Sequence, residues 1–214
     1  MAAQWPKIRP YLPAPPAHVI EVGCGRLGGF VPALRSCGYQ ALGIDPAAPD
    51  GDSYWRIEVE RAELHGQANA VVACTSLHHL ADPGGVLDKM AQLLAPGGLV
   101  IVVEWGWERF DEATAEWCFE RLGESESWLH HRRNEWITSA QSWQRYLETW
   151  ANEHRIHTGG AVLGELDQRL RRQLCRRGPY FFADLTNTTE DDELRAINSG
   201  EIQATRIDYV GTLP

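Results

Sequence analysis

The first half of the chain alternates short apolar runs with segments of helical periodicity. Helices are indicated at residues 30–38, which end at a glycine, and at residues 83–95, where apolar side chains recur at helical spacing behind Pro83. Strands that alternate with helices favour a parallel sheet with helices on both faces. The apolar, β-branched runs predict strands at residues 18–22, 40–45, 53–58, 68–74 and 99–104.

The pattern changes after Glu104. Seven of the nine tryptophans lie in residues 105–150, a segment that predicts helices joined by loops. Trp136, Trp143 and Trp150 recur every seven residues, so they would share one face if a single helix spanned them. Beyond them we expect a charged helix at residues 165–174, a strand at 179–185, a capped acidic helix at about 188–199 and a last strand at 201–211.

These elements predict one domain over residues 1–214, an α/β fold with residues 105–178 as a Trp-rich helical cap or insertion. Composition agrees, because 214 residues with 43% apolar content can bury a full core. The net charge of −9, without a basic run, argues against a nucleic-acid partner. Five scattered cysteines indicate free thiols, and neither a signal peptide nor a membrane span is indicated, so we expect a cytoplasmic protein, monomeric or homodimeric.

The turn after the first strand carries the first sign of chemistry. Gly23-x-Gly25-x-x-Gly28 has the spacing of a dinucleotide-binding turn, and Asp45 follows about 20 residues later, where such a fold binds a ribose. Glycines there allow a tight turn and a close approach of a ligand to the backbone. Taken alone, the spacing indicates an NAD(P)-dependent reductase.

Glu21, two residues before the first glycine, argues for a different ligand. The pyrophosphate of NAD would face this carboxylate across a gap of low dielectric constant, where repulsion between like charges is strong. S-adenosylmethionine (SAM) instead carries a cationic sulfonium and an ammonium group. An acid near the turn therefore favours SAM and disfavours NAD.

Four collinear motifs carry a resemblance to a known family: "EVGCG" at residues 21–25, "GID" at 43–45, "SLHHLADP" at 76–83 and "LLAPGGLVIVVE" at 93–104. Together they resemble the class I SAM-dependent methyltransferases, and most closely the small type-11 methyltransferases related to quinone-biosynthesis enzymes. The resemblance implies a Rossmann-like, seven-stranded and mostly parallel sheet that ends in an antiparallel hairpin. This chain departs from the family pattern at Leu27, which stands where the third glycine usually comes.

The resemblance also implies roles for individual residues. Asp45, with Pro46 beside it, would accept hydrogen bonds from the ribose hydroxyls, and Glu60 falls where the family often has an acid near the adenine amine. The cofactor would be SAM and the product S-adenosylhomocysteine (SAH). The residues that would shape the methionine end of the cofactor, or lie beside it, are Glu21, Gly23, Cys24, Gly25 and Cys74.

Methyl transfer to an alcohol or phenol needs a base that removes the acceptor's proton, and histidine suits this role near neutral pH. His78 and His79 follow the fourth strand and Glu104 ends the fifth, so all three should meet at the carboxyl edge of the sheet. Some natural-product O-methyltransferases that the sequence resembles pair a histidine of this motif with an acid of the fifth strand. Trp105 and Trp107 follow directly and are the candidate substrate contacts.

We therefore predict a methyltransferase that acts on a small molecule, through an O-, N- or C-nucleophile of an aromatic or hydroxylated metabolite, as in secondary metabolism. One alternative is a SAM-binding protein of the same fold that transfers no methyl group, such as a cyclase or a partner subunit. The NAD(P)-dependent reductase is the other. The histidines at positions 130, 131, 154 and 157 lack the spacing of a recognised metal site, so no metal is expected.

Overall fold

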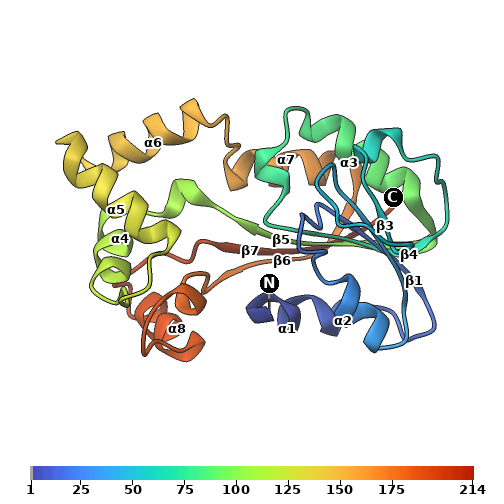
Figure 1. Ribbon diagram of the computed structural model, residues 1–214, viewed down its shortest axis with the longest axis horizontal. Coiled ribbons are helices and arrows are strands. Elements are labelled where there is room, and N and C mark those ends of the chain that lie inside the picture. The colour runs from blue at the N-terminus through green and yellow to red at the C-terminus, as the bar shows by residue number, and fades with distance from the viewer. Residues whose placement is uncertain (1) are drawn as a thin grey trace.

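The computed structural model describes residues 2–214 and contains one seven-stranded sheet with helices on both faces (Figure 1). The strand order is β3-β2-β1-β4-β5-β7-β6, and all pairs are parallel except those of β7 with β5 and with β6. The strands are β1 His18–Val22, β2 Gln40–Ile44, β3 Tyr54–Trp55, β4 Ala68–Cys74, β5 Leu94–Trp105, β6 Arg171–Gly178 and β7 Arg206–Thr212. The fold class expected from the sequence is confirmed.

Helices cover the two faces of the sheet from different parts of the chain (Figure 1). On one face lie α1 (Trp5–Ile8) and α2 (Val31–Ser36), and on the other α3 (Pro83–Leu93) and α7 (Gly159–Arg169). Because side chains alternate along a strand, β4 supplies Val71 to the cluster under α3 and α7, and Val72 to the cluster under α1 and α2. Short 3-10 helices join the elements at Ala2–Gln4, Arg9–Tyr11, Val59–Arg61, Leu77–His79, Trp107–Arg109 and Phe182–Asp184.

The first five predicted strands are all present. Those at residues 18–22 and 68–74 have the predicted bounds, and β5 begins five residues earlier than expected, at Leu94. The third strand is only Tyr54–Trp55, because it lies at the edge of the sheet and the chain then leaves for the 3-10 turn at Val59–Arg61. The predicted helices at residues 30–38 and 83–95 are α2 and α3, and both end slightly earlier than expected.

Two predictions near the C-terminus are wrong. The helix predicted over residues 165–174 ends at Arg169, and its last residues belong to β6, which pairs with β7 in place of the strand predicted at 179–185. Edge strands tolerate charged side chains on exposed positions, and β6 exposes its arginines while Leu174 is half-buried. Residues 179–185 instead form a turn, in which the backbone N–H groups of Tyr180 and Phe182 donate to the carboxylate of Glu193.

The tryptophans at positions 136, 143 and 150 do not share one helix. Trp136 lies in α5 (Trp128–Ser139), whereas Trp143 and Trp150 lie in α6 (Trp143–Glu153). The break is at Ala140, which has a left-handed backbone (φ +53°). Trp136 and Trp143 pack edge to face across this corner with ring centroids 5.4 Å apart, so the seven-residue repeat reflects a contact between two helices.

Beyond the carboxyl ends of β5 and β6, helices α4 (Glu112–Phe119), α5, α6 and α8 (Glu190–Asn198) form a separate lobe, which we call the cap (Figure 1). Helix α8 is the predicted acidic helix, and Thr189 and Asp192 form its capping box. Two chain segments build the cap, because residues 106–156 and residues 179–202 both contribute. Its buried apolar cluster comprises Trp105, Trp107, Phe110, Ala115, Trp117, Cys118, Leu129, Trp143, Tyr146, Leu147, Ala151, Ile156, Phe181, Ala196 and Ile202.

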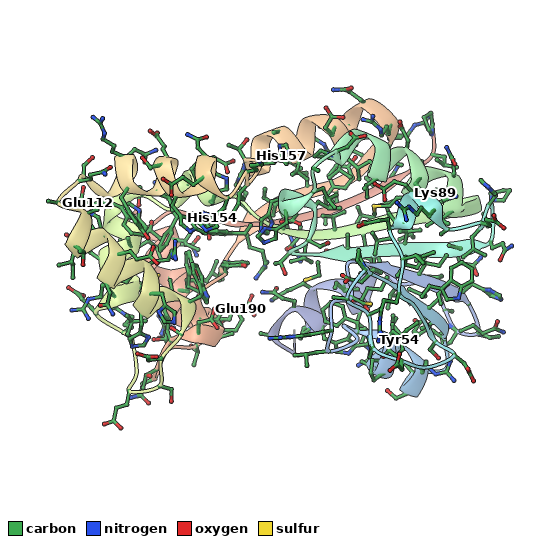
Figure 2. The ribbon with its side chains drawn as sticks, turned by 45° about the horizontal axis from the view of Figure 1, so that its top comes forward. Tyr54, Lys89, Glu112, His154, His157 and Glu190 are labelled. Atoms are coloured by element: carbon green, nitrogen blue, oxygen red, sulfur yellow. The ribbon has the colours of Figure 1, made fainter. Side chains whose placement is uncertain are left out.

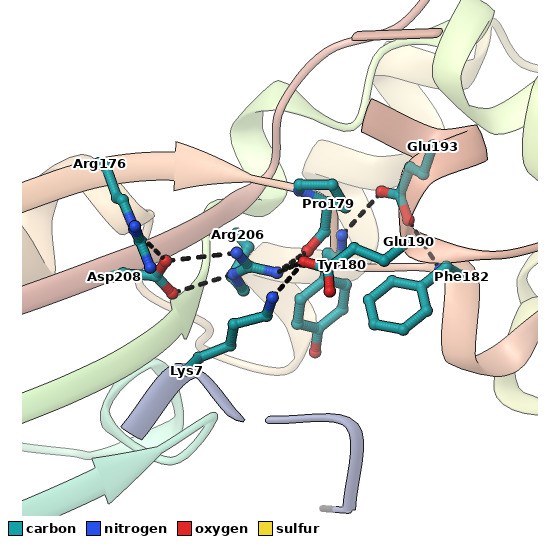
Figure 3. Close-up of polar contacts among 9 residues, drawn as sticks. All are labelled: Lys7, Arg176, Pro179, Tyr180, Phe182, Glu190, Glu193, Arg206 and Asp208. Carbon is teal, nitrogen blue, oxygen red and sulfur yellow. Dashed lines mark hydrogen bonds and ion pairs between the residues drawn. The ribbon is translucent and has the colours of Figure 1, made fainter. Parts of the chain in front are cut away.

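An ion-pair network around the buried Arg206 and Asp208 connects the cap to the sheet (Figure 3). The guanidinium of Arg206 in β7 pairs with Asp208 at 2.9 Å and with Glu190 of α8 at 3.3 Å, and its side chain is only 4% exposed. Lys7 of α1 reaches the same Glu190, and Arg176 of β6 reaches Asp208 at 2.9 Å. One network thus joins α1, the terminal hairpin and the cap.

Candidate active site

The glycine-rich turn leads from β1 into α2 and needs glycine for steric reasons. Gly23 has φ +82°, and a Cβ at this position would come within 2.5 Å of the Ser76 side chain, which follows β4. The N–H of Gly25 donates to the Asp45 carboxylate at 2.9 Å, and Ala47 donates to its other oxygen at 2.7 Å. The turn after β1 is thereby tied to the ends of β2 and β4.

A cavity of about 340 Å³ opens at the carboxyl ends of β1, β2 and β4, within the size range of small-molecule sites. Among residues 2–214, its wall contains the three carboxylates Asp45, Glu58 and Glu60 and no lysine or arginine. The full wall is Val22, Gly23, Ile44, Asp45, Pro46, Glu58, Val59, Glu60, Thr75, Ser76, Leu77, His79, Leu80 and Val86. Apolar walls beside acidic groups fit a nucleoside that carries cationic groups, and they fit the pyrophosphate of NAD poorly.

Five of the residues proposed from the sequence therefore lie in one cavity wall: Gly23, Asp45, Pro46, Glu60 and His79. The sequence analysis missed Glu58, Thr75 and Ser76. The available signal was that Glu58 lies only two residues before Glu60. Both carboxylates lie at the 3-10 turn at Val59–Arg61, Glu58 just before it and Glu60 within it. A larger hollow of about 410 Å³ lies at the amino ends of β1 and β2, away from every candidate residue.

Glu21 does not lie in the cavity wall. Its side chain is buried beneath the turn, where its Oε2 accepts from the Phe30 N–H at 2.7 Å and its Oε1 has no hydrogen-bond partner among residues 2–214. Burial raises the pKa of Glu21 to about 7, although the Phe30 and Val31 N–H groups favour the charged form. The acids that face the cavity are Asp45, Glu58 and Glu60, so the charge argument first made from Glu21 depends on these residues instead.

Cys24 and Cys74 are both buried and also lie outside this wall. Cys24 packs against Gly43, where an added Cβ would come 2.8 Å from its sulfur. Burial raises the pKa of each thiol to about 12, so both stay protonated near neutral pH. The structure thus places these cysteines, like Glu21, in the packing around the cavity.

His78 and Glu104 are brought together as a hydrogen-bonded pair at the carboxyl ends of β4 and β5. The Nδ1 of His78 contacts Oε2 of Glu104, and both side chains are almost completely buried. The same carboxylate accepts from the N–H groups of Ser76 at 2.8 Å, Leu77 at 2.7 Å and Trp105 at 3.0 Å. Both oxygens of Glu104 therefore accept hydrogen bonds. Because Nδ1 of His78 is occupied by Glu104, Nε2 is the ring nitrogen that can bind another group.

His79 has a different environment, although its ring lies 4.1 Å from that of His78. It lines the cavity and its side chain is exposed at the rim. Partial burial, and next the neighbouring His78 ring, lower the pKa of His79 below its usual value. Of the two histidines, one faces the predicted cofactor cavity and the other is held by a carboxylate.

Trp105 lies at the junction of sheet and cap. Its ring packs edge-on to His78 at 6.3 Å, near-parallel to Tyr180 at 5.9 Å, and against Trp128 and Trp150 at 5.4 and 6.3 Å. Trp107 instead anchors the cap, because its Nε1 donates to the His157 carbonyl at 3.1 Å. Figure 2 shows His154 and His157 in this region between the two lobes. The aromatic neighbours of Trp105 come from remote segments and could not be paired from sequence alone.

Within the part of the chain that the structure describes, no group of histidine, cysteine and acidic side chains is arranged to bind a metal ion. None of the helices in residues 2–214 combines the length and the apolar character that crossing a bilayer would require.

A parallel sheet with a reversed last hairpin, a glycine turn after β1 and an acidic cavity at the strand ends define the class I methyltransferase fold. The sequence profile of the methyltransferase domain family matches residues 1–157, and the chain belongs to this family. SAM is the cofactor of the family, and the acidic, largely apolar cavity fits it.

Solved structures of the same fold include a SAM-dependent methyltransferase from Mesorhizobium loti, with a TM-score of 0.59 at 17% identity over 98% of this chain and 97% of that one. Another is geranyl diphosphate C-methyltransferase from Streptomyces coelicolor A3(2), with a TM-score of 0.62 at 14% identity over 100% and 79% of the two chains.

Among curated proteins, a ubiquinone biosynthesis O-methyltransferase of Bradyrhizobium sp. (strain ORS 278) is 25% identical over 56% of this chain and 51% of that protein. A protein of the same name from Rhodopseudomonas palustris (strain TIE-1) is 25% identical over 44% and 42%. The matches thus span about half of each relative or less.

Proposed function

We propose that this protein transfers the methyl group of SAM to an oxygen of a small hydroxylated aromatic molecule, with His78 as the base. The pairing of His78 with Glu104, directly beside the aromatic cluster around Trp105, is the observation that supports this most. When bound, SAM supplies an electrophilic methyl carbon on its sulfonium. The O-methyltransferase names of the curated relatives support oxygen as the acceptor atom.

In this proposal the cavity binds the cofactor through Asp45 at the ribose and Glu60 near the adenine. The acceptor lies between the cofactor and the aromatic side chains of the cap, which exclude water from it. Glu104 holds Nδ1–H of His78, so Nε2 carries a lone pair that accepts the acceptor's hydroxyl proton. The carboxylate then stabilises the histidine cation, as in other acid–histidine pairs.

The test compares His78→Ala and Glu104→Gln with the wild type in two assays. The first is calorimetric titration with SAH, and the second is SAH formation from SAM over a panel of phenols and catechols. Loss of a general base lowers turnover by roughly a hundredfold or more. We expect that loss in both variants, with SAH affinity within about threefold of wild type.

His65→Ala is the control, because this histidine is exposed and lies outside the cavity wall. Its turnover should stay near that of the wild type. Equal losses of turnover and SAH affinity in His78→Ala would contradict the base assignment and indicate a structural role.

A SAM-binding protein that transfers no methyl group is the second candidate, favoured by the extensive backbone bonding of Glu104, which a purely structural carboxylate would also show. SAH binding without SAH formation on any acceptor of the panel would support it. Tight NADH binding that is lost in Asp45→Ala would instead support the reductase, against the acidic cavity wall.

A further inference from the structure

Arg132 of α5 lies inside the cap with part of its hydrogen-bonding capacity unused. Its side chain is only 13% exposed, and its guanidinium lies over the Trp150 ring, 4.7 Å from the ring centroid. Its Nη2 donates to Glu135 at 2.9 Å, whereas its Nη1 is buried and has no partner among residues 2–214. A buried, charged donor without a partner is strongly unfavourable, so this atom lacks an acceptor that something else can supply.

A second unpaired donor lies beside the same tryptophan. The ring of Trp105 is 6.3 Å from that of Trp150, and the Nε1–H of Trp105 is buried without a partner in the described chain. Other indole N–H groups of the cap, those of Trp107, Trp128, Trp136 and Trp143, all donate to an oxygen. Among residues 2–214, the buried donors of this aromatic cluster that lack acceptors are those of Trp105 and Arg132.

These two donors lie in the aromatic cluster that adjoins the proposed base, His78. Trp105 contacts His78 at a ring distance of 6.3 Å, so the cluster begins at the proposed base and extends through Trp150 to Arg132. Trp128, Trp150 and Tyr180 are only half-buried, which lets the cluster reach the surface. A flat molecule among these rings would present one end to His78 and another to Arg132.

We propose that the methyl acceptor carries a carboxylate, which pairs with Nη1 of Arg132, and that Nε1 of Trp105 donates to an oxygen of the same molecule. This inference rests on the proposed function and names the class of its substrate, an aromatic hydroxy acid. Glu135 already neutralises part of the guanidinium charge. A singly charged, planar carboxylate therefore matches the site better than a doubly charged phosphate.

The experiment uses matched acid and amide probes on the full chain saturated with SAH. The pairs are 4-hydroxybenzoate with 4-hydroxybenzamide and 4-hydroxycinnamate with 4-hydroxycinnamamide, and phenyl phosphate is a further probe. Binding is followed by tryptophan fluorescence, because Trp105 and Trp150 border the site. A charge-assisted hydrogen bond predicts that the acid of at least one pair binds about ten- to a hundredfold more tightly than its amide.

Arg132→Met should abolish this preference, Arg132→Lys should keep part of it, and Arg133→Met should leave it unchanged. Arg133 is the matched control because it is the next residue of α5 and is exposed. No preference for the acid in either pair, a preference that survives in Arg132→Met, or Arg132-dependent binding that is tighter for phenyl phosphate would each overturn the proposal.

SAH titration of every variant separates this proposal from the proposed function. Unchanged SAH affinity together with a lost acid preference supports the carboxylate site. Failure of SAH to bind the wild type would refute the proposed function itself, whereas SAH binding and turnover without any acid preference would refute only the carboxylate site.

Discussion

Replacement of Glu21 by glutamine tests whether the acid under the glycine turn is protonated in the folded protein. Burial raises its folded pKa from 4.5 to about 7, and its Oε1 has no partner among residues 2–214. Glutamine has nearly the same shape, and its carbonyl oxygen can keep the hydrogen bond from Phe30. The substitution therefore removes the titration while it preserves the packing.

The sign and size of the effect follow from the two pKa values. Below pH 4.5 the carboxyl is protonated in both states, and its contribution to stability is complete. As the pH rises through 7, the folded state must ionise a buried group, so that contribution is lost. The difference of about 2.5 pKa units corresponds to about 3 kcal/mol at 1.36 kcal/mol per unit.

Thermal unfolding at pH 5 and at pH 8 measures this difference. Glu21→Gln should gain about 2.5 kcal/mol relative to wild type between the two pH values, because part of the contribution is already lost at pH 5; this is about 5–10 °C for a chain of this size. Glu63→Gln, a change at an exposed acid, is the control and should show no such shift. A stability difference between Glu21→Gln and wild type that does not vary with pH, or that favours wild type at pH 8, would refute the reasoning.

Two further substitutions test the turn and the ion-pair network. Gly29→Ala places a Cβ onto the Glu21 carboxylate at a residue with φ +56°. It should lower the melting temperature by several degrees more than the control Gly97→Ala, where φ is +78° but the space for a Cβ is open. Equal losses in the two variants would show that only backbone strain acts. Arg206→Met leaves Asp208 buried with one partner fewer, and urea unfolding should show a loss of about 3–5 kcal/mol. A loss below 1 kcal/mol in the same assay would contradict that estimate.

The sheet could be predicted because the burial of its central strands is visible in their own sequences. Strands β1 and β4 are buried on both faces, so their β-branched runs are continuous and end at glycines or turns. Strand β6 gives no such signal, since "RRQLCRR" at an exposed edge has the composition of a helix surface. The aromatic run at residues 179–185 resembles a strand in composition, but its backbone donors are satisfied by Glu193, a contact that sequence spacing does not reveal.

The candidate site was predictable where the fold itself brings residues together. Asp45 and His79 follow parallel strands, so the topology alone places them at one edge. Glu21 also ends near this edge, yet the direction of its side chain depends on the turn at residues 28–30, which leaves room beneath it. Arg132 was not found, because nothing in "LHHRRNEW" distinguishes a buried arginine from its exposed neighbour until α5 is packed on α6.

In the proposed function the cap contacts the acceptor, so its two-segment construction would limit how acceptor specificity is exchanged between relatives. Grafting residues 106–156 alone would leave Phe181, from beyond β6, packed against foreign side chains at positions 110 and 128. A chimera that exchanges the whole cap needs crossovers around both segments, residues 106–156 and 179–202, and must keep Arg206 and Glu190 as a pair. Recombination should therefore spread new acceptor preferences slowly in this family, and point substitution at the cap tryptophans is the easier route.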